Sequence, residues 1–330
     1  MPVASVVVPA FNASTTLSAT LCALQAQTCK DFEIIVVDDG SRDTTPVIAL
    51  DAARNDPRIH VVRQANRGLA GARNSGIAAA RGDFIGFCDA DVLWLPDKLA
   101  THIRHLQASP SVGVSFSGAM VLDRGGNLIG KTQVPRLSGI TAHDVFLHYP
   151  IENASTVVMR RETIKAIAWH PRFESQRAWV FDETFARCDD IECWLRLALT
   201  TDWKLEGIDG DLVQWHLNPL ALSESLQQRF AYWDRMVTKL TPLDPDFFFE
   251  FTHVARAFKC KRLAQLAICL RDGKDANAMI TECLSSSRTP LFQEPMTTLS
   301  TLVSAMTLCC AESTPIKELM AVFQRSKTQM

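Results

Sequence analysis

The sequence predicts an α/β protein, in which helices cover both faces of a largely parallel sheet and an all-helical extension follows. Over the first hundred residues, short β-branched runs alternate with amphipathic stretches. These runs are short and largely apolar, which is typical of strands buried on both faces. From about Phe230 onward the strand signals fade, and the remaining apolar patterns have the period of helices.

The expected elements of the first part follow one another regularly. We expect strands at 4–8, 33–37, 59–62 and 84–88, and helices at 14–27, 46–54 and 69–80. Pro46 directly follows Thr44 and Thr45, an arrangement typical of a helix start. Strands separated by helices favour parallel pairing.

The second part is less regular. A hairpin is expected at 112–122 with its turn at 124–127, a strand at 155–159, an acidic cluster leading into a helix within 180–201, and a closing strand pair at 203–215. Four helices are expected at 247–270, 275–285, 297–310 and 316–325. We therefore predict a main domain at 1–225, with halves 1–110 and 111–225, and a helical extension at 226–330.

Composition excludes several classes of protein. The formal net charge of −2 provides no general basic field, so no nucleic-acid partner is expected. The ten cysteines include no CxxC pair, which favours reduced thiols over a disulfide framework or a zinc site. We find neither a cationic leader nor an apolar run of about 20 residues. A cytoplasmic protein is expected.

The ends of the predicted strands carry distinctive side chains. The first strand ends in Pro9-Ala10-Phe11-Asn12, the second in Asp38-Asp39-Gly40-Ser41 and the fourth in Asp89-Ala90-Asp91. In doubly wound sheets, ligands bind at the carboxyl ends of the strands. These residues are therefore expected to line one edge together.

Asp89 and Asp91 flank Ala90, so an extended backbone would point both carboxylates to one side, within reach of a divalent cation. A metal held by one or two carboxylates usually completes its shell with substrate phosphates. The alternative is a solvated turn, because aspartate is common there.

Two further strand-end stretches are suited to a nucleotide. Asp39 can accept a hydrogen bond from a pyrimidine ring, and Phe11 offers a face for stacking, although a lone phenylalanine is more often part of a core. Arg73 lies in the first turns of a helix that opens with Gly68 and Gly71, where an anion can bind. The stretch matches neither the dinucleotide fingerprint nor a P-loop, which argues against a dehydrogenase or an ATPase.

Asp189, Asp190 and Glu192 precede a helix in CDDIECWLRLAL. Acidic residues in a first turn often only complement the helix dipole. A carboxylate that faces a metal site can instead remove a proton from an attacking hydroxyl. Spacing alone favours neither interpretation.

Together these stretches resemble the inverting glycosyltransferases of family 2. The matching segments are SVVVPAFNASTTLSATLCALQAQTCKDFEIIVVDDGSRDTT, NRGLAGARNSGIAAARGDFIGFCDADVLWLPDKL and, more weakly, CDDIECWLRLAL. They lie within roughly residues 1–220, and several ordered motifs are more specific than any one of them. The resemblance implies the GT-A fold, a Rossmann-like, doubly wound mixed sheet.

The resemblance also implies roles in holding the donor. Pro9, Phe11 and Asp39 match positions that hold the uridine base, and Asn12 is assigned beside them. The family usually has tyrosine at the Phe11 position, so stacking is kept and a hydroxyl contact is lost. Arg73 matches the helix position that approaches the diphosphate.

The metal and the base are implied in the same way. Asp89, Ala90 and Asp91 match the D-x-D motif, with Asp91 preferred as the direct ligand of Mn²⁺ or Mg²⁺. The family often has a polar residue where this chain has Val92, so the metal shell is expected to be sparser. Asp190 matches the catalytic base of a Glu-Asp motif whose first member is Asp189 here. His216 lies where relatives carry a histidine near the diphosphate or metal, although one histidine beside a tryptophan is more often structural.

The implied reaction transfers a sugar from a UDP-sugar to a carbohydrate or lipid-linked acceptor by single displacement. A Q-x-x-R-W motif and membrane helices, typical of processive synthases, are not found, so transfer of one sugar at a time is expected in polysaccharide or glycolipid assembly. The acceptor side is expected at 149–156. Contact with the inner membrane face would be peripheral, through Arg256, Lys259, Lys261 and Arg262, which otherwise form a solvated helix face.

Two alternatives remain open at this point. The chain could be a catalytically silent nucleotide-sugar binder or an assembly subunit whose helical extension is the working part. A nucleotidyltransferase shares the layered fold, but it would need a glycine- and lysine-rich loop where this chain has PAFNAST. The donor sugar, the acceptor and the oligomeric state are not specified by the sequence.

Overall fold

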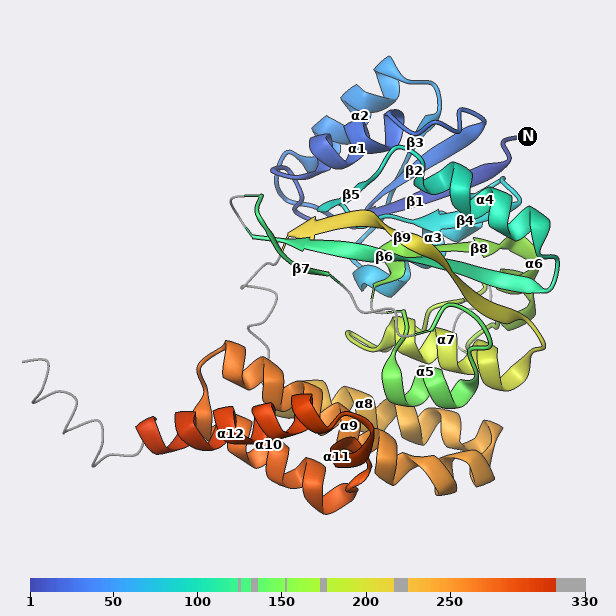
Figure 1. Ribbon diagram of the computed structural model, residues 1–330. Coiled ribbons are helices and arrows are strands. Elements are labelled where there is room, and N and C mark those ends of the chain that lie inside the picture. Colours follow the sequence, from blue (N-terminus) through green and yellow to red (C-terminus); the bar gives the residue numbers. More distant parts are fainter. Residues whose placement is uncertain (124–125, 132–135, 152, 173–176, 217–224, 313–330) are drawn as a thin grey trace, which may run out of the picture. The chain divides into compact units, whose positions relative to one another are not determined.

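The computed structural model describes residues 1–123, 126–131, 136–151, 153–172, 177–216 and 225–312. The chain divides into two compact units, residues 1–223 and 224–330. The first unit is a mixed sheet with helices and the second is helical (Figure 1). The predicted fold class is therefore confirmed.

The sheet of the first unit has nine strands among the described residues, in the order β3-β2-β1-β4-β8-β6-β9-β5, with β7 paired to β6. The strands are β1 (Ala4–Ala10), β2 (Phe32–Asp38), β3 (Ile59–Arg63), β4 (Phe84–Phe87), β5 (Val92–Trp94), β6 (Val112–Leu122), β7 (Leu128–Lys131), β8 (Val157–Arg160) and β9 (Lys204–His216). The first four pair in parallel, and β8 then runs antiparallel to both β4 and β6.

The helices of this unit are α1 (Leu17–Gln25), α2 (Thr45–Asn55), α3 (Gly68–Ala79), α4 (Lys98–Ala108), α5 (Ala142–His148), α6 (Arg161–Ile167) and α7 (Asp189–Thr200), with a short 3₁₀ turn, η1, at Ala154–Thr156. Every strand and helix expected in the first 90 residues is found. The hairpin of β6 and β7 is also found, although residues 124 and 125 of its turn lie outside the described residues.

The expected closing strand pair at 203–215 is wrong, because the structure has one long strand there. Gly210 has φ +108°, and the register between β6 and β9 shifts on either side of Gly118. The turn-like sequence Asp209-Gly210-Asp211 therefore forms an irregularity within β9 rather than a reversal of the chain.

Alternate residues of β1 face two different helical layers. Val6 and Val8 belong to a core that includes Leu21 of α1 and Leu99 of α4. Val7 faces the other way, toward α3, where Gly76 leaves no room for a side chain. The sheet is thus covered on both faces here, which explains why every residue of β1 and β2 is buried.

Gly82, between α3 and β4, allows the close approach of two backbones. A Cβ atom at this position would lie 2.4 Å from the carbonyl carbon of Ala4. We expect Gly82→Ala to lower the free energy of unfolding by about 3 kcal/mol, because the backbone of β1 cannot move aside cheaply. Urea unfolding measures this loss. Gly130→Ala is the control, because a Cβ atom there meets nothing within 4 Å, and an equal loss in both variants would contradict the prediction.

The second unit consists of α8 (Leu226–Leu240), α9 (Pro245–Cys269), α10 (Gly273–Ser286), α11 (Thr289–Gln293) and α12 (Pro295–Glu312), with a 3₁₀ turn, η3, at Thr241–Leu243. Three of the four expected helices are found, and the one at 316–325 lies outside the described residues. No helix in the described ranges is both long and apolar enough to span a bilayer.

The basic cluster of the extension is not a uniform solvated face. Lys261 is only 3% exposed and forms an ion pair with Glu294. The Nε of Arg256 lies 3.0 Å from Glu282. Lys261 therefore cannot contribute to the predicted contact with anionic lipid.

Candidate functional site

A cleft of about 440 Å³ opens where β1 and β4 end. It is lined by Pro9, Phe11, Asn12, Ala13, Thr15, Thr16, Leu69, Asp89, Ala90 and Asp91. Six of these ten are residues that the sequence singled out, from two segments almost 80 positions apart. The parallel register of β1 and β4 brings the segments together, because Val7 pairs with Phe87.

The end of β1 is shaped by Asn12, which has the left-handed φ of +50°. The side-chain oxygen of Asn12 accepts a hydrogen bond from the backbone nitrogen of Arg42, at 2.9 Å. The backbone nitrogen of Asn12 donates to Ser41 Oγ, at 3.1 Å. These bonds tie the end of β1 to the end of β2. Phe11 is left 50% exposed and lines the cleft rather than packing in the core.

The two aspartates after β2 have different surroundings. Asp38 accepts hydrogen bonds from the Ser41 nitrogen and from Arg63 Nε, both at 3.1 Å, and so holds the turn. Asp39 is buried, and one of its oxygens accepts from Gln64 Nε2, at 2.7 Å, and from the backbone nitrogen of Arg67, at 2.8 Å. These two donors fix the orientation of the Asp39 carboxylate.

Asp89 and Asp91 lie in a turn between β4 and β5, not on an extended strand end. The nitrogen of Val92 donates to the Asp89 carbonyl, at 3.0 Å, and the Asp89 nitrogen donates to Ser155 Oγ, also at 3.0 Å. The extended backbone on which the predicted orientation of the two carboxylates depended is therefore absent at these residues. The turn nevertheless leaves both residues lining the same cleft.

Arg73 links this turn to the start of α7. Its guanidinium donates to Asp89, at 3.2 Å, and to Asp189, at 3.0 Å, and it lies 5.3 Å from the ring centre of Phe181. The side chain is almost fully buried, and the two carboxylates beside it raise its pKa against the opposing effect of burial. A buried cation with two anionic partners is a rigid connection, because breaking either pair leaves a buried charge uncompensated.

Asp91 lies opposite His216, since Val92 pairs with Trp215 in the antiparallel ladder of β5 and β9. The side chain reaches the surface, but the cleft walls exclude part of its hydration. This partial desolvation and the negative charge of Asp89 raise the pKa of Asp91, and His216 opposes the rise. Asp91 forms no ion pair with the described residues, whereas Asp89 shares Arg73.

Asp189 and Asp190 begin α7, and both carboxyl groups are perturbed. Burial, against the opposing charge of Arg73, raises the pKa of Asp189 to about 6. Burial also raises the pKa of Asp190, again opposed by Arg73. A carboxyl group with a raised pKa is a stronger proton acceptor once it is ionised.

The carboxylates suit a hard divalent cation. Asp89 and Asp91 provide two oxygen donors at a cleft, and their mutual repulsion, visible in the raised pKa of Asp91, would be relieved by a cation. Within the described ranges, no group of three or more histidine, cysteine or acidic residues is arranged as a complete metal cage. The arrangement fits a metal whose remaining ligands come from a bound phosphate group.

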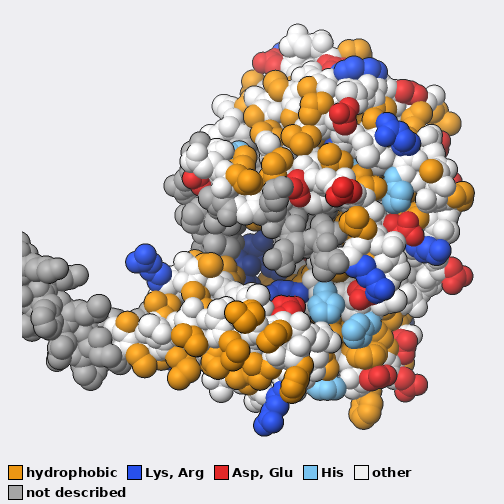
Figure 2. Space-filling model, viewed as in Figure 1, with side chains coloured by type: hydrophobic (Ala, Val, Ile, Leu, Met, Phe, Trp, Pro, Cys, Tyr) orange, Lys and Arg blue, Asp and Glu red, His pale blue; other side chains and the backbone are white. Residues whose placement is uncertain are grey.

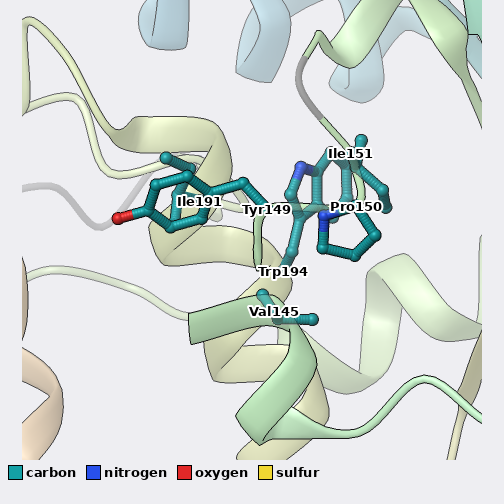
Figure 3. A pocket seen from close by; sticks show the side chains of 6 residues that line it. All are labelled: Val145, Tyr149, Pro150, Ile151, Ile191 and Trp194. Carbon is teal, nitrogen blue, oxygen red and sulfur yellow. The ribbon is translucent and has the colours of Figure 1, made fainter. Parts of the chain in front are cut away.

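Apolar side chains pack beside the start of α7 around a gap that is too narrow for a water molecule (Figure 3). The gap is lined by Val145, Tyr149, Pro150, Ile151, Ile191 and Trp194. Ile191 and Trp194 come from α7, directly after Asp190, and the others from α5 and the loop that follows it. The indole nitrogen of Trp194 is buried there without a hydrogen-bond partner among the described residues.

Sequence reasoning missed two supporting residues. Gln64 orients Asp39 and lies in the loop after β3, where nothing in its local pattern marks it. Ser155, which holds the Asp89 nitrogen, lies in the stretch 149–156 that was expected only on the acceptor side. Their roles follow from contacts between segments far apart in the chain.

Residues 5–167 match the family model described as glycosyl transferase family 2. The chain carries a family 2 glycosyltransferase domain. This domain includes the whole of the cleft described above. The predicted resemblance is therefore confirmed.

Individual relatives match different lengths of the chain. EpsJ of Bacillus subtilis, an uncharacterised glycosyltransferase, is 47% identical over 28% of this chain and 26% of its own length. The amylovoran biosynthesis glycosyltransferase AmsB of Erwinia amylovora is 28% identical over 73% of this chain and 79% of its own. The matches to EpsJ and two further bacterial glycosyltransferases span only 26% to 42% of those relatives.

A solved structure extends the comparison beyond the family 2 domain. The structure of Staphylococcus aureus TarS 1-349 in complex with UDP-GlcNAc has a TM-score of 0.59 and 16% identity, over 94% of this chain and 91% of that chain. At this identity the likeness concerns the fold. The predicted GT-A fold with a helical C-terminal region is thus confirmed.

Proposed function

We propose that this chain is an inverting glycosyltransferase that moves a sugar from a UDP-sugar to an acceptor hydroxyl. The observation that carries the proposal is the shared cleft of Phe11, Asn12, Asp89 and Asp91, joined through Arg73 to the acidic start of α7. A donor-holding surface and a candidate base are thereby connected within one unit of the fold. The family 2 domain and the UDP-GlcNAc complex of TarS support a nucleotide-sugar donor.

The donor would bind mainly to residues 1–110. The exposed ring of Phe11 would stack on the uracil, against Pro9, and the oriented carboxylate of Asp39 would accept from its ring N–H. Asn12 holds the loop between these groups. The guanidinium of Arg73 is already bonded to Asp89 and Asp189. In this arrangement Arg73 would therefore hold the D-x-D turn in place beside the diphosphate rather than bind the diphosphate directly.

Asp91, with Asp89 and His216 beside it, would hold Mn²⁺ or Mg²⁺, and Ala90 lines the cleft between the two aspartates. When bound, such a cation offsets the negative charge that builds on a departing diphosphate. Because Arg73 already neutralises Asp89, Asp91 is assigned as the principal ligand.

Asp190 would accept the proton of the attacking hydroxyl, from the face of the sugar opposite the nucleotide. One base is sufficient, because a nucleoside diphosphate leaves without being protonated, in contrast to the leaving group of a glycosidase. Direct attack from the opposite face inverts the anomeric centre.

The acceptor would bind to residues 111–223, where Tyr149, Pro150 and Ile151 pack beside Ile191, the residue that follows Asp190 in α7. Polysaccharide assembly is the proposed setting, in line with the amylovoran role printed for AmsB. A carbohydrate or lipid-linked acceptor that receives one sugar at a time, at the inner membrane face, fits this assignment.

The proposal is tested by incubation with a panel of UDP-sugars and Mn²⁺ in the absence of acceptor. Slow release of UDP from one of them, abolished by chelation, is expected. Metal-dependent UDP binding without any release would instead support a silent nucleotide-sugar binder. Neither release nor metal-dependent binding would overturn the proposal.

Sugar transfer is expected to decline at a higher pH than an ordinary aspartate would give, because the base must be ionised and burial raises the pKa of Asp190 against the opposing charge of Arg73. An ordinary aspartate would retain activity to near pH 4. A profile of kcat/KM against pH measures the acid limb. Asp189→Asn, which removes a neighbouring negative charge, should move the limb to lower pH, and an unmoved limb would contradict this assignment.

A further inference from the structure

The outer face of α12 carries an apolar stripe formed by Met296, Leu299, Val303 and Met306. Their exposed fractions are 79%, 48%, 62% and 52%. The residues alternate in steps of three and four, which places them on one side of a helix. We call these four residues the α12 stripe.

The opposite side of α12 is occupied by the core of its own unit. Thr298, Thr301 and Ala305 are at most 4% exposed, and Ala305 belongs to the cluster formed with α9 and α10. Near its end the helix backbone packs on Gly273, where a Cβ atom would lie 2.5 Å from the nitrogen of Cys309. The helix is therefore held in place, and the stripe is the side left to solvent.

The stripe is large for a surface that faces water. Phe292, 81% exposed in the preceding α11, extends it, and the five side chains together expose roughly 600 Å² of apolar surface. That is at the upper end of the roughly 300–600 Å² typical of the largest patch on a monomer. Figure 2 shows apolar side chains gathered along the arm of the second unit that contains α12.

The chemistry of α12 indicates what covers this face. From Pro295 to Ala311 the helix contains no charged residue, and its exposed residues outside the stripe are all uncharged: Pro295, Thr297, Ser300, Ser304, Thr307 and Cys310. Helices that lie on membranes usually carry lysine or arginine on their polar face, and a highly charged partner would find no counter-charge here. A second, identical helix meets neither obstacle, because two neutral faces do not repel each other.

We propose that the α12 stripe is the self-association surface of this chain, with a second copy of α12 as its occupant. Alternating steps of three and four are the spacing by which two helices interlock their side chains. A two-fold axis places the same patch on both partners, so each stripe covers the other. Roughly 600 Å² of apolar surface with a rim of serine and threonine approaches the roughly 800 Å² that each partner contributes to a stable interface.

The test is the mass of the full chain in solution at micromolar concentration, by sedimentation velocity and light scattering. The wild type is expected at twice the 36.6 kDa of one chain. Leu299→Lys combined with Val303→Lys is expected to weaken dimerisation at least about 100-fold, because four ammonium groups would meet in an apolar contact. Both positions are at least 48% exposed, so the variant should keep the far-UV circular dichroism spectrum of the folded chain.

The matched control is Leu243→Lys combined with Phe249→Lys, which charges two exposed apolar positions outside the stripe. It should remain dimeric. A monomeric wild type, or a dimer that the α12 variant leaves intact, would overturn the proposal. So would a wild-type monomer that floats with vesicles of phosphatidylethanolamine and phosphatidylglycerol and loses flotation in the α12 variant, which would identify lipid as the occupant.

Discussion

Asp190→Asn is expected to lower kcat for sugar transfer by about 10²–10⁴-fold while leaving the affinity for UDP nearly unchanged. The amide keeps the size of the side chain and can still accept the hydrogen bond from the Ile191 nitrogen, at 2.8 Å. It cannot accept a proton from the attacking hydroxyl. Steady-state transfer and calorimetric UDP binding measure the two effects separately.

Asp209→Asn is the control for this substitution, because it neutralises an exposed aspartate elsewhere in the same unit. It should retain full activity. The burial that raises the pKa of Asp190 also makes its charge costly, so the asparagine variant should be at least as stable to heat as the wild type. Undiminished transfer by the asparagine variant would remove Asp190 from the reaction.

Asp91→Ala is expected to weaken both transfer and UDP binding, each by at least about tenfold, and to abolish the effect of Mn²⁺ on UDP affinity. The physical reason is that Asp89 is committed to Arg73, which leaves Asp91 as the carboxylate available to a cation. Hard divalent cations need such an oxygen donor beside the phosphates. UDP titrations with and without Mn²⁺ measure the effect.

Asp97→Ala is the matched control, because Asp97 is an exposed residue a few positions further on whose side chain does not cap α4. Its UDP affinity should match that of the wild type. If Asp91→Ala retained a metal-dependent affinity equal to the wild type, the cation would have to bind elsewhere, and the assignment of the D-x-D turn would fail.

The parallel half of the sheet could be predicted from the sequence because each of its elements is local. The runs at β1, β2, β3 and β4 are largely apolar, and the first three are each followed directly by a helix. Strand ends in such a sheet meet at one edge by topology alone. This is why Phe11 and Asp91 could be placed in the same cleft from residue types and order.

The remaining features depend on contacts that no local pattern encodes. In β9, Gly210 forms an irregularity because β6 provides a continuous partner on either side of it. Likewise, the sequence suggests a phosphate group as the partner of Arg73, whereas the structure pairs its guanidinium with the carboxylates of Asp89 and Asp189. Helix α8 is an exception: it is not among the expected helices, although its buried Leu226, Trp233, Val237 and Leu240 recur with the period of a helix.

The bridge from Asp89 through Arg73 to Asp189 has a consequence for protein engineering. The bridge joins the two halves of the first unit through one buried charge. A chimera that takes its second half from a relative would therefore leave Arg73 without one of its carboxylate partners, unless the relative also has an acidic residue at the position of Asp189. Exchanges intended to recombine donor and acceptor specificity should therefore treat these three residues as a single inherited block.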